Sequence, residues 1–295
     1  MIRSITHISR RFYAYQNERF PLVLLSLSLF PVTLSSAAVV PKFTIMGIVL
    51  GFIASLAYIF HIRVNDEDRD FEHDTAHHAT RPLQQGTITL NELKIINTIA
   101  ICSMALIAVL SGLEAIFIAL IMIIYSYFAR HDFFYKEKIR RHFFIYNLVH
   151  IIQILLLQIF VYAVIAHRIQ FTELLLTHFL FTLTGTAIFE FVRKLKIPGE
   201  DGTGMDTYTH HLGFNKSMTV YSVLILLNTI LFFFISEMIL PSIMIWIYSS
   251  VSLIIVGCSI WVHWIKRVGV TDKLMQGIFL LVYAVYNISI YFFIH

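Results

Sequence analysis

Charged residues are scarce in this sequence, and so are cysteine and proline. Only 14% of its 295 residues are charged, whereas a soluble domain carries about 25%. The 2 cysteines, Cys102 and Cys258, both fall in apolar runs and exclude a disulfide scaffold. This composition, with a net charge of only +4, also excludes a disordered chain and a soluble basic nucleic-acid-binding protein. We therefore expect no nucleic-acid partner.

Apolar residues, by contrast, are abundant. They make up 58% of the chain, and the mean hydropathy is +0.76. A helix needs about 20 mostly apolar residues to cross the bilayer core. Nine runs qualify, at residues 21–40, 43–62, 95–112, 115–129, 143–166, 171–191, 218–236, 239–261 and 274–294. The sequence therefore predicts an all-α, multi-pass membrane protein, with about nine transmembrane helices forming a single domain over residues 1–295.

Two parts of this pattern allow another interpretation. The third and fourth are separated only by residues 111–114, but Gly112 and Glu114 favour a tight turn between two spans. The first run is preceded by basic residues and contains small residues at 35–38, as a signal peptide would. Its basic region is about 20 residues long and another span follows at once, so we expect a retained helix.

The basic residues are distributed asymmetrically between the predicted loops. With the N-terminus in the cytoplasm, 20 of the 22 basic residues lie on the cytoplasmic side, as the positive-inside rule requires. The chain is then expected in the inner (cytoplasmic) cell membrane. Its two long polar loops, at about 63–94 and 192–217, both face the cytoplasm.

Acidic residues gather in two places. The first acidic segment, residues 66–74, contains Asp66, Glu67, Asp68, Asp70, Glu72 and Asp74. The second, residues 190–206, contains Glu190, Glu200, Asp201 and Asp206. As a continuation of the second span, Glu67, Asp70 and Asp74 would share one helix face.

Like charges at this spacing repel each other, and a divalent cation would reverse that repulsion. Mg²⁺ binds through a few carboxylates together with substrate phosphates, so the two segments are candidates for holding a diphosphate. A solvated acidic loop is the alternative, and the residues alone leave both interpretations open.

Basic side chains are interleaved with these acids. Arg81 stands in a turn containing Pro82 and Gly86, while Arg193 and Lys194 follow Glu190. Arginine binds phosphate through two hydrogen bonds and lysine acts as a point charge. Ordinary cytoplasmic anchoring explains most other basic residues but is less adequate for these three.

These motifs resemble those of the UbiA superfamily of membrane prenyltransferases. That family carries one acidic motif after its second helix and another after its sixth. Here the first is Asp66-Glu67-x-x-Asp70-x-x-x-Asp74 with Arg81-Pro-Leu-x-x-Gly downstream, which looks like a bacterial branch of the family. The second begins at Glu190-Phe-Val-Arg193-Lys194, and the resemblance covers nearly the whole chain.

The resemblance implies an enzyme that transfers a prenyl group from a polyprenyl diphosphate to a small acceptor, expected to be aromatic. Mg²⁺ and basic residues would neutralise the diphosphate so that it leaves an allylic carbocation. The implied metal ligands are Glu67, Asp70, Asp74, Glu190 and Asp201. The implied remaining site residues are Asp66, Arg81, Arg193 and Lys194 in catalysis and phosphate binding, with Arg63, Arg130 and Asn65 at the substrate.

Two other functions are weighed against this one. A transporter or cation channel could use the acidic loops as a cytoplasmic vestibule, but it should place ionisable groups near mid-bilayer, where the predicted spans hold almost none. A UbiA-like enzyme with a non-aromatic acceptor is the second. His73 and His77 have the spacing of some zinc sites, but no cysteine or HExxH pattern accompanies them, so we do not expect zinc.

Overall fold

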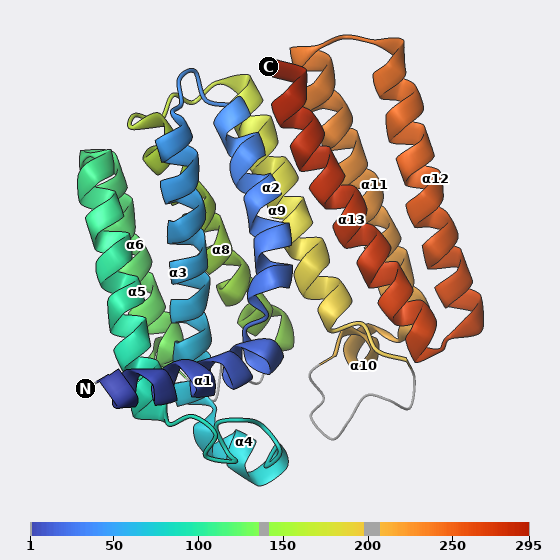
Figure 1. The fold of residues 1–295 in the computed structure, drawn as a ribbon. Coiled ribbons are helices and arrows are strands. Elements are labelled where there is room, and N and C mark those ends of the chain that lie inside the picture. Colours follow the sequence, from blue (N-terminus) through green and yellow to red (C-terminus); the bar gives the residue numbers. More distant parts are fainter. Residues whose placement is uncertain (1, 136–141, 198–206, 295) are drawn as a thin grey trace. The chain divides into compact units, whose positions relative to one another are not determined.

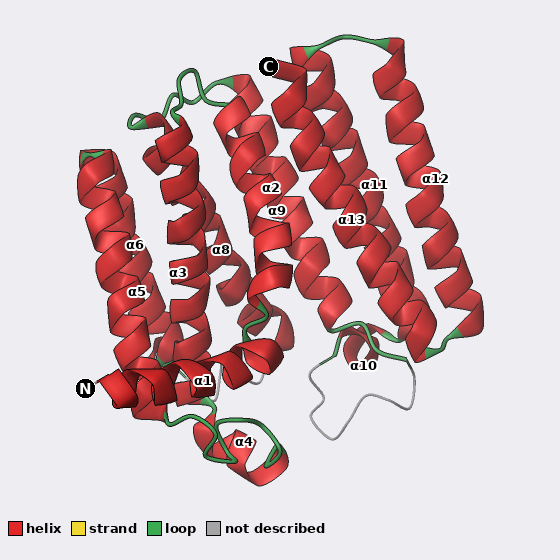
Figure 2. Cartoon of the chain, in the orientation of Figure 1, coloured by secondary structure: helices red, strands yellow, loops and turns green. Residues whose placement is uncertain are grey.

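The computed structural model describes residues 2–135, 142–197 and 207–294 (Figure 1). Every regular element in these residues is helical (Figure 2). Eight helices are long and apolar enough to cross a membrane, and a bent helix pair at the N-terminus gives up to nine spans. The prediction of an all-α, multi-pass membrane protein is therefore confirmed.

The helices follow the predicted runs closely. The eight spans are α3 (Ile45–Arg69), α5 (Leu90–Ser111), α6 (Leu113–Arg130), α8 (Phe143–Ala166), α9 (Glu173–Arg193), α11 (Phe214–Ile239), α12 (Ile243–Lys266) and α13 (Gly269–Ile294). The other elements are α1 (Ile2–Arg19), α2 (Leu22–Ala38), α4 (Phe71–His77), α10 (Tyr208–Leu212) and the short 3₁₀ helix η1 (Asp132–Phe134). The chain forms two compact units, of which each is described by itself.

The first unit comprises residues 1–33, 42–142 and 159–169. It begins with the bent pair, in which α1 meets α2 at 66°. Proline disfavours helical geometry in the residue before it and is best accommodated at the start of a helix. Pro21 therefore separates the two helices, and α2 begins at Leu22. Both acidic and basic residues around the end of α3 belong to this unit.

The expected break between the third and fourth spans is present in the first unit. Helix α5 ends at Ser111 and α6 begins at Leu113. Gly112 between them has φ 112°, a conformation that side chains with a Cβ rarely adopt. Two spans joined by a one-residue turn, rather than one long helix, are thus confirmed.

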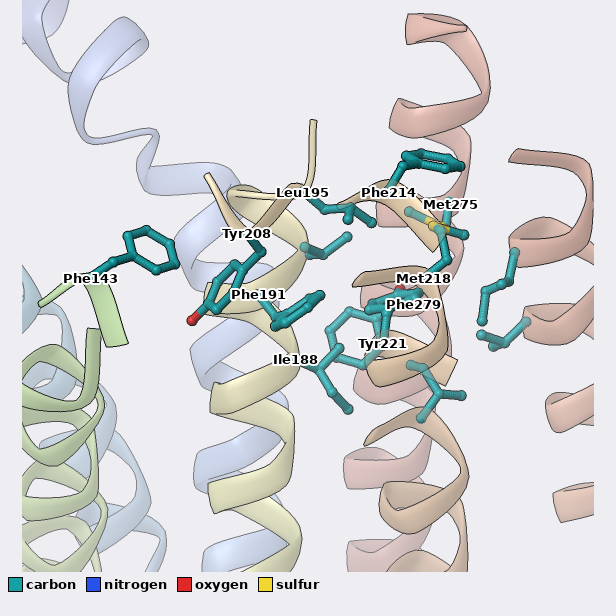
Figure 3. Close-up of a cluster of buried hydrophobic side chains, with 14 residues drawn as sticks. Phe143, Ile188, Phe191, Leu195, Tyr208, Phe214, Met218, Tyr221, Met275 and Phe279 are labelled. Atoms are coloured by element: carbon teal, nitrogen blue, oxygen red, sulfur yellow. The ribbon is translucent and has the colours of Figure 1, made fainter. Parts of the chain in front are cut away.

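The second unit comprises residues 34–41, 143–158 and 170–295. Its core is a cluster of apolar side chains, drawn from α9, α11, α12 and α13 with Phe143 and Tyr208 (Figure 3). Tyr221 and Met218 of α11 and Met275 of α13 are fully buried in it. The cluster packs around the end of α9 that carries Glu190, so it fixes the position of the second acidic segment's first residues.

Close packing within the second unit predicts a stability effect at Gly185. The ring of Tyr283 on α13 occupies the space that a side chain on Gly185 of α9 would fill. We expect Gly185→Ala to destabilise the protein by about 1–3 kcal/mol, because overpacking forces the ring or the helix to move. Thermal unfolding in detergent measures this effect. Gly257→Ala is the matched control, since Gly257 has open space around it, and equal effects from both substitutions would contradict the prediction.

Candidate functional site

The first acidic segment spans a helix break. Helix α3 ends at Arg69, Asp70 leaves helical geometry with φ −100° and ψ 9°, and α4 begins at Phe71. Asp66 and Glu67 therefore lie on the last turn of a membrane span, whereas Asp74 lies on α4. The expectation of one continuous helix is wrong. Repulsion among carboxylates four residues apart disfavours such a helix, and the break falls within that row of acids.

Glu67 is the most buried of these acids. Its side chain is 1% exposed, and its Oε1 atom accepts hydrogen bonds from Arg63 Nη2 at 2.6 Å, Arg19 Nε at 3.0 Å and Tyr15 Oη at 3.4 Å. Its other oxygen, Oε2, is buried and has no hydrogen-bond partner among the described residues. A buried carboxylate oxygen without a donor is costly, so this atom is suited to a cation.

Asp74 is joined to Glu67 through a shared arginine. Arg81 donates to Oδ2 of Asp74, and Arg19 Nη2 lies 4.0 Å from the same oxygen. Because Arg19 also binds Glu67, one guanidinium links two carboxylates that come from different helices. The structure thus brings Glu67, Asp74 and Arg81 together.

Arg19 and Tyr15 were not predicted as site residues. They belong to α1 and reach Glu67 across 48 and 52 residues of sequence. The bend between α1 and α2 positions them, and a bend angle has no signal in the hydrophobic pattern. The only available hint is Pro21, which predicts a helix boundary but not its direction.

Three of the remaining acids of the segment, Asp66, Asp68 and Asp70, form two further groups. Arg69 Nη2 lies 3.0 Å from Asp66 Oδ1 and 2.9 Å from Asp70 Oδ2. Asp68 pairs with Lys94 Nζ at 2.7 Å and with Arg130. Arg130, predicted at the substrate, is therefore held by Asp68, a residue that was not assigned a role. The segment is not a bare acidic patch, because basic side chains pair with five of its carboxylates, those of Asp66, Glu67, Asp68, Asp70 and Asp74.

Asn65, which directly precedes the acids, lies within a buried hydrogen-bond network. Its Nδ2 atom is 3.1 Å from His61 Nε2, and His61 Nδ1 is 3.1 Å from Asn97 Oδ1. An amide oxygen can only accept, so His61 carries its proton on Nδ1 and its Nε2 accepts from Asn65. Both side chains are buried. The network holds the amide of Asn65 in one orientation beside the site.

In the second unit, two basic side chains form ion pairs with Glu190. Arg193 Nη2 lies 2.9 and 2.8 Å from its two carboxylate oxygens, and Lys194 Nζ lies 3.0 Å from Oε1. The three residues predicted from this motif are thus together. Asp201 was also predicted here, but it lies outside the described residues, as do Glu200 and Asp206.

Aromatic rings surround Lys194 and the end of α9. The ammonium group lies 5.5 Å from the ring centre of Phe143 and 5.3 Å from that of Tyr146, distances at which cation–π attraction operates. It also donates to Asn147. Sequence reasoning did not assign these three residues to the site, because they lie on α8, 40 or more residues earlier in the chain.

Tyr208 completes this aromatic surround. It stacks on Phe191 at 4.0 Å between ring centres and meets Phe143 edge-on at 4.8 Å (Figure 3). Burial, and next the negative charge of Glu190, raise the pKa of Tyr208 to about 12. The phenol is therefore neutral and able to donate a hydrogen bond at physiological pH.

The donor atoms of the first unit match a hard divalent cation in chemical type, although among the described residues the oxygen atoms of Glu67, Asp70 and Asp74 do not all lie within 4.8 Å of one another. Glu67, Asp70 and Asp74 offer carboxylate oxygens, which Mg²⁺ prefers. The unpartnered Oε2 atom of Glu67 supports this fit. Arg63 pairs with Glu67, and Arg81 pairs with Asp74. A phosphate bound to the metal would therefore meet these two arginine side chains.

Sequence comparison and structural comparison give different results for this chain. No family model and no curated protein matches its sequence. Solved structures do match over nearly the full length of both chains. A digeranylgeranylglyceryl phosphate synthase shares 19% identity and a TM-score of 0.62, covering 95% of this chain and 99% of the other.

Two archaeal structures match in the same way. A UbiA homologue from Aeropyrum pernix K1 shares 13% identity, with a TM-score of 0.68 and coverage of 90% and 97%. A UbiA homologue from Archaeoglobus fulgidus, solved with GPP and Mg²⁺, shares 14% identity, with a TM-score of 0.57 and coverage of 94% and 98%.

The protein is thus a polytopic helical membrane protein. Its fold is that of the UbiA homologues, and the resemblance inferred from the motifs is confirmed at the level of the fold.

Proposed function

We propose that this protein is a membrane prenyltransferase that takes its prenyl group from a polyprenyl diphosphate. The observation that carries the proposal is the linkage of Glu67 and Asp74 through Arg19 at the end of a membrane span. The shared fold supports it, because one structure with that fold binds GPP and Mg²⁺. Fold alone does not define chemistry, so the proposal depends on the side chains.

The first unit supplies the groups that a diphosphate requires. Diphosphate leaves only when its negative charge is balanced. Mg²⁺, when bound by Glu67, Asp70 and Asp74, would supply positive charge to the phosphate oxygens. Arg81 and Arg63 then exchange carboxylate partners for phosphate oxygens, which guanidinium groups bind through two hydrogen bonds. Asp66 neighbours this set through Arg69.

The second unit supplies a pre-oriented basic pair. Glu190 holds Arg193 and Lys194 in fixed positions, so little side-chain entropy is lost when they bind an anion. Within this proposal the pair, together with Glu190 and Asp201, has the phosphate-binding and metal-binding role that the second motif implies. The apolar interior of the helices excludes water from the allylic cation.

The acceptor is proposed to be aromatic, with a non-aromatic acceptor as the variant. The product in the name of the matched digeranylgeranylglyceryl phosphate synthase is not aromatic. An assay therefore has to include aromatic and non-aromatic acceptors. Asn65, held by His61, is the side chain proposed to contact the acceptor or a water beside it.

Diphosphate release from the purified, full-length protein tests the proposal. The protein in detergent is incubated with prenyl diphosphates of increasing chain length, an aromatic or a glyceryl phosphate acceptor, and Mg²⁺ or a chelator. We expect release that requires Mg²⁺ and prenyl diphosphate together. Absence of both Mg²⁺-dependent binding and release across the panel would overturn the proposal.

The proposed orientation places both acidic segments in the cytoplasm. In a chain whose Cys102 and Cys258 are replaced by serine, we expect an impermeant maleimide to label Gln170→Cys in intact cells. Gln85→Cys and His210→Cys should react only after the cells are opened. All three positions are exposed, so accessibility decides the result. Labelling of Gln85→Cys from outside would reverse the orientation, and opposite behaviour of Gln85→Cys and His210→Cys would refute the shared side.

A further inference from the structure

We propose that helix α4 carries a second kind of metal site, one for a borderline divalent cation such as Zn²⁺ or Co²⁺. Its ligands are His73, Asp74 and His78. One ligand atom from each of these residues lies within 4.8 Å of the others. His73 and His78 are exposed, whereas Asp74 is buried. Two exposed imidazoles therefore flank a buried carboxylate that Arg81 and Arg19 contact.

The local backbone explains why these three residues meet. On a continuous helix, His73 and His78 would point about 140° apart. His78 instead leaves the helix with φ −137° and ψ 46°, and this change returns its ring toward His73, with 6.3 Å between ring centres. The pair His73 and His77, which the sequence pattern favours, has a ring distance of 4.6 Å. His77 does not belong to the group that converges on Asp74.

Asp74 has an oxygen suited to this role. Both guanidinium contacts, from Arg81 and Arg19, are made to Oδ2, which leaves Oδ1 for a metal ion. Tetrahedral ligands at about 2.1 Å from a metal lie about 3.4 Å from each other. The ligand atoms, within 4.8 Å of one another, therefore need to close by up to about 1.4 Å, which rotation of the exposed imidazole side chains provides.

The donor set selects the cation. Imidazole nitrogen binds Zn²⁺, Co²⁺ and Ni²⁺ well, whereas Mg²⁺ prefers oxygen. Three protein ligands and one open position are the pattern of exchangeable zinc sites. The fourth ligand is then water or an anion.

Occupancy of this site has a consequence that rests on the proposed function. Asp74 cannot orient toward the two imidazoles and toward a magnesium ion beside Glu67 without sharing its charge between two cations. Zn²⁺ on α4 is thus expected to weaken Mg²⁺-dependent binding of a prenyl diphosphate.

Cobalt titration of the metal-free, untagged, full-length protein tests the site directly. We expect a saturable visible absorption band at one Co²⁺ per chain that Zn²⁺ abolishes. His73→Ala and His78→Ala should each weaken binding at least tenfold, whereas His77→Ala, the matched control, should change it less than twofold. A parent without the band, alanine variants that bind like the parent, or an equal loss in His77→Ala would overturn the assignment.

A second measurement separates this inference from the proposed function. With GPP and Mg²⁺, added Zn²⁺ should reduce GPP binding by the parent and leave the His73→Ala/His78→Ala double variant unaffected. Equal inhibition of both proteins would refute the competition. If the parent fails to bind GPP with Mg²⁺, the proposed function fails, while the cobalt titration still decides whether the metal site exists.

Discussion

Replacing Asp74 with asparagine is expected to lower Mg²⁺-dependent diphosphate release at least 100-fold. The substitution keeps the size of the side chain but removes the charge that Arg81 and Arg19 share and one hard ligand for Mg²⁺. Losing about 2.7 kcal/mol of transition-state stabilisation gives a 100-fold lower rate. Single-turnover release with saturating prenyl diphosphate measures this effect separately from binding.

Glu72→Gln is the matched control for this prediction. It removes the same charge from the same short helix, but Glu72 is exposed, so release should stay within about twofold of the parent. A uniform loss in both variants would indicate that only the net negative charge of the segment matters. Parent-like activity of Asp74→Asn would remove Asp74 from the proposed machinery.

Glu67→Gln is expected to lower the stability of the fold as well as the activity. The glutamine leaves the guanidinium groups of Arg19 and Arg63, 19% and 24% exposed, without their shared counter-charge. Breaking a fully buried ion pair costs about 3–5 kcal/mol and an exposed one less than about 1 kcal/mol. For these partly exposed arginines we expect about 2–3 kcal/mol, measured by unfolding in detergent.

A double-mutant cycle shows whether this cost comes from the ion pair. Arg19→Gln alone should also destabilise the protein, because it leaves Glu67 and Asp74 undercompensated. In the Glu67→Gln background the same substitution should cost less, since the surplus positive charge is then partly removed. Strict additivity of the two single effects would show that Arg19 and Glu67 do not stabilise each other.

Much of the fold is predictable from the sequence because bilayer thickness sets helix length. The runs at 143–166 and 239–261 match α8 and α12 within a few residues. The break at Gly112 follows from glycine's conformational freedom. The break at Asp70 was missed because the spacing of the acids extends α3 through them, whereas Asp70 leaves helical geometry.

The composition of the site is less predictable than its location. Spacing identifies Glu67, Asp74 and Arg81 because they lie within 15 residues of one another. The partners that hold them, Arg19 and Tyr15, come from α1, and contacts across about 50 residues depend on how two helices are angled. The same limit applies to Asn147 and Phe143 around Lys194.

Because of the 66° bend after Arg19, the amino-terminal helix contributes a positive charge to the acidic site. Deleting residues 1–20 removes the Arg19 guanidinium, which contacts both Glu67 and Asp74. These two acids are then left with surplus negative charge near the C-terminal end of α3. A rigid fusion that straightens the junction at Pro21 has the same effect with every residue still present. Truncations and tags at this end therefore alter ion affinity together with stability, because Tyr15 and Phe20 of the same segment are buried in a hydrophobic cluster.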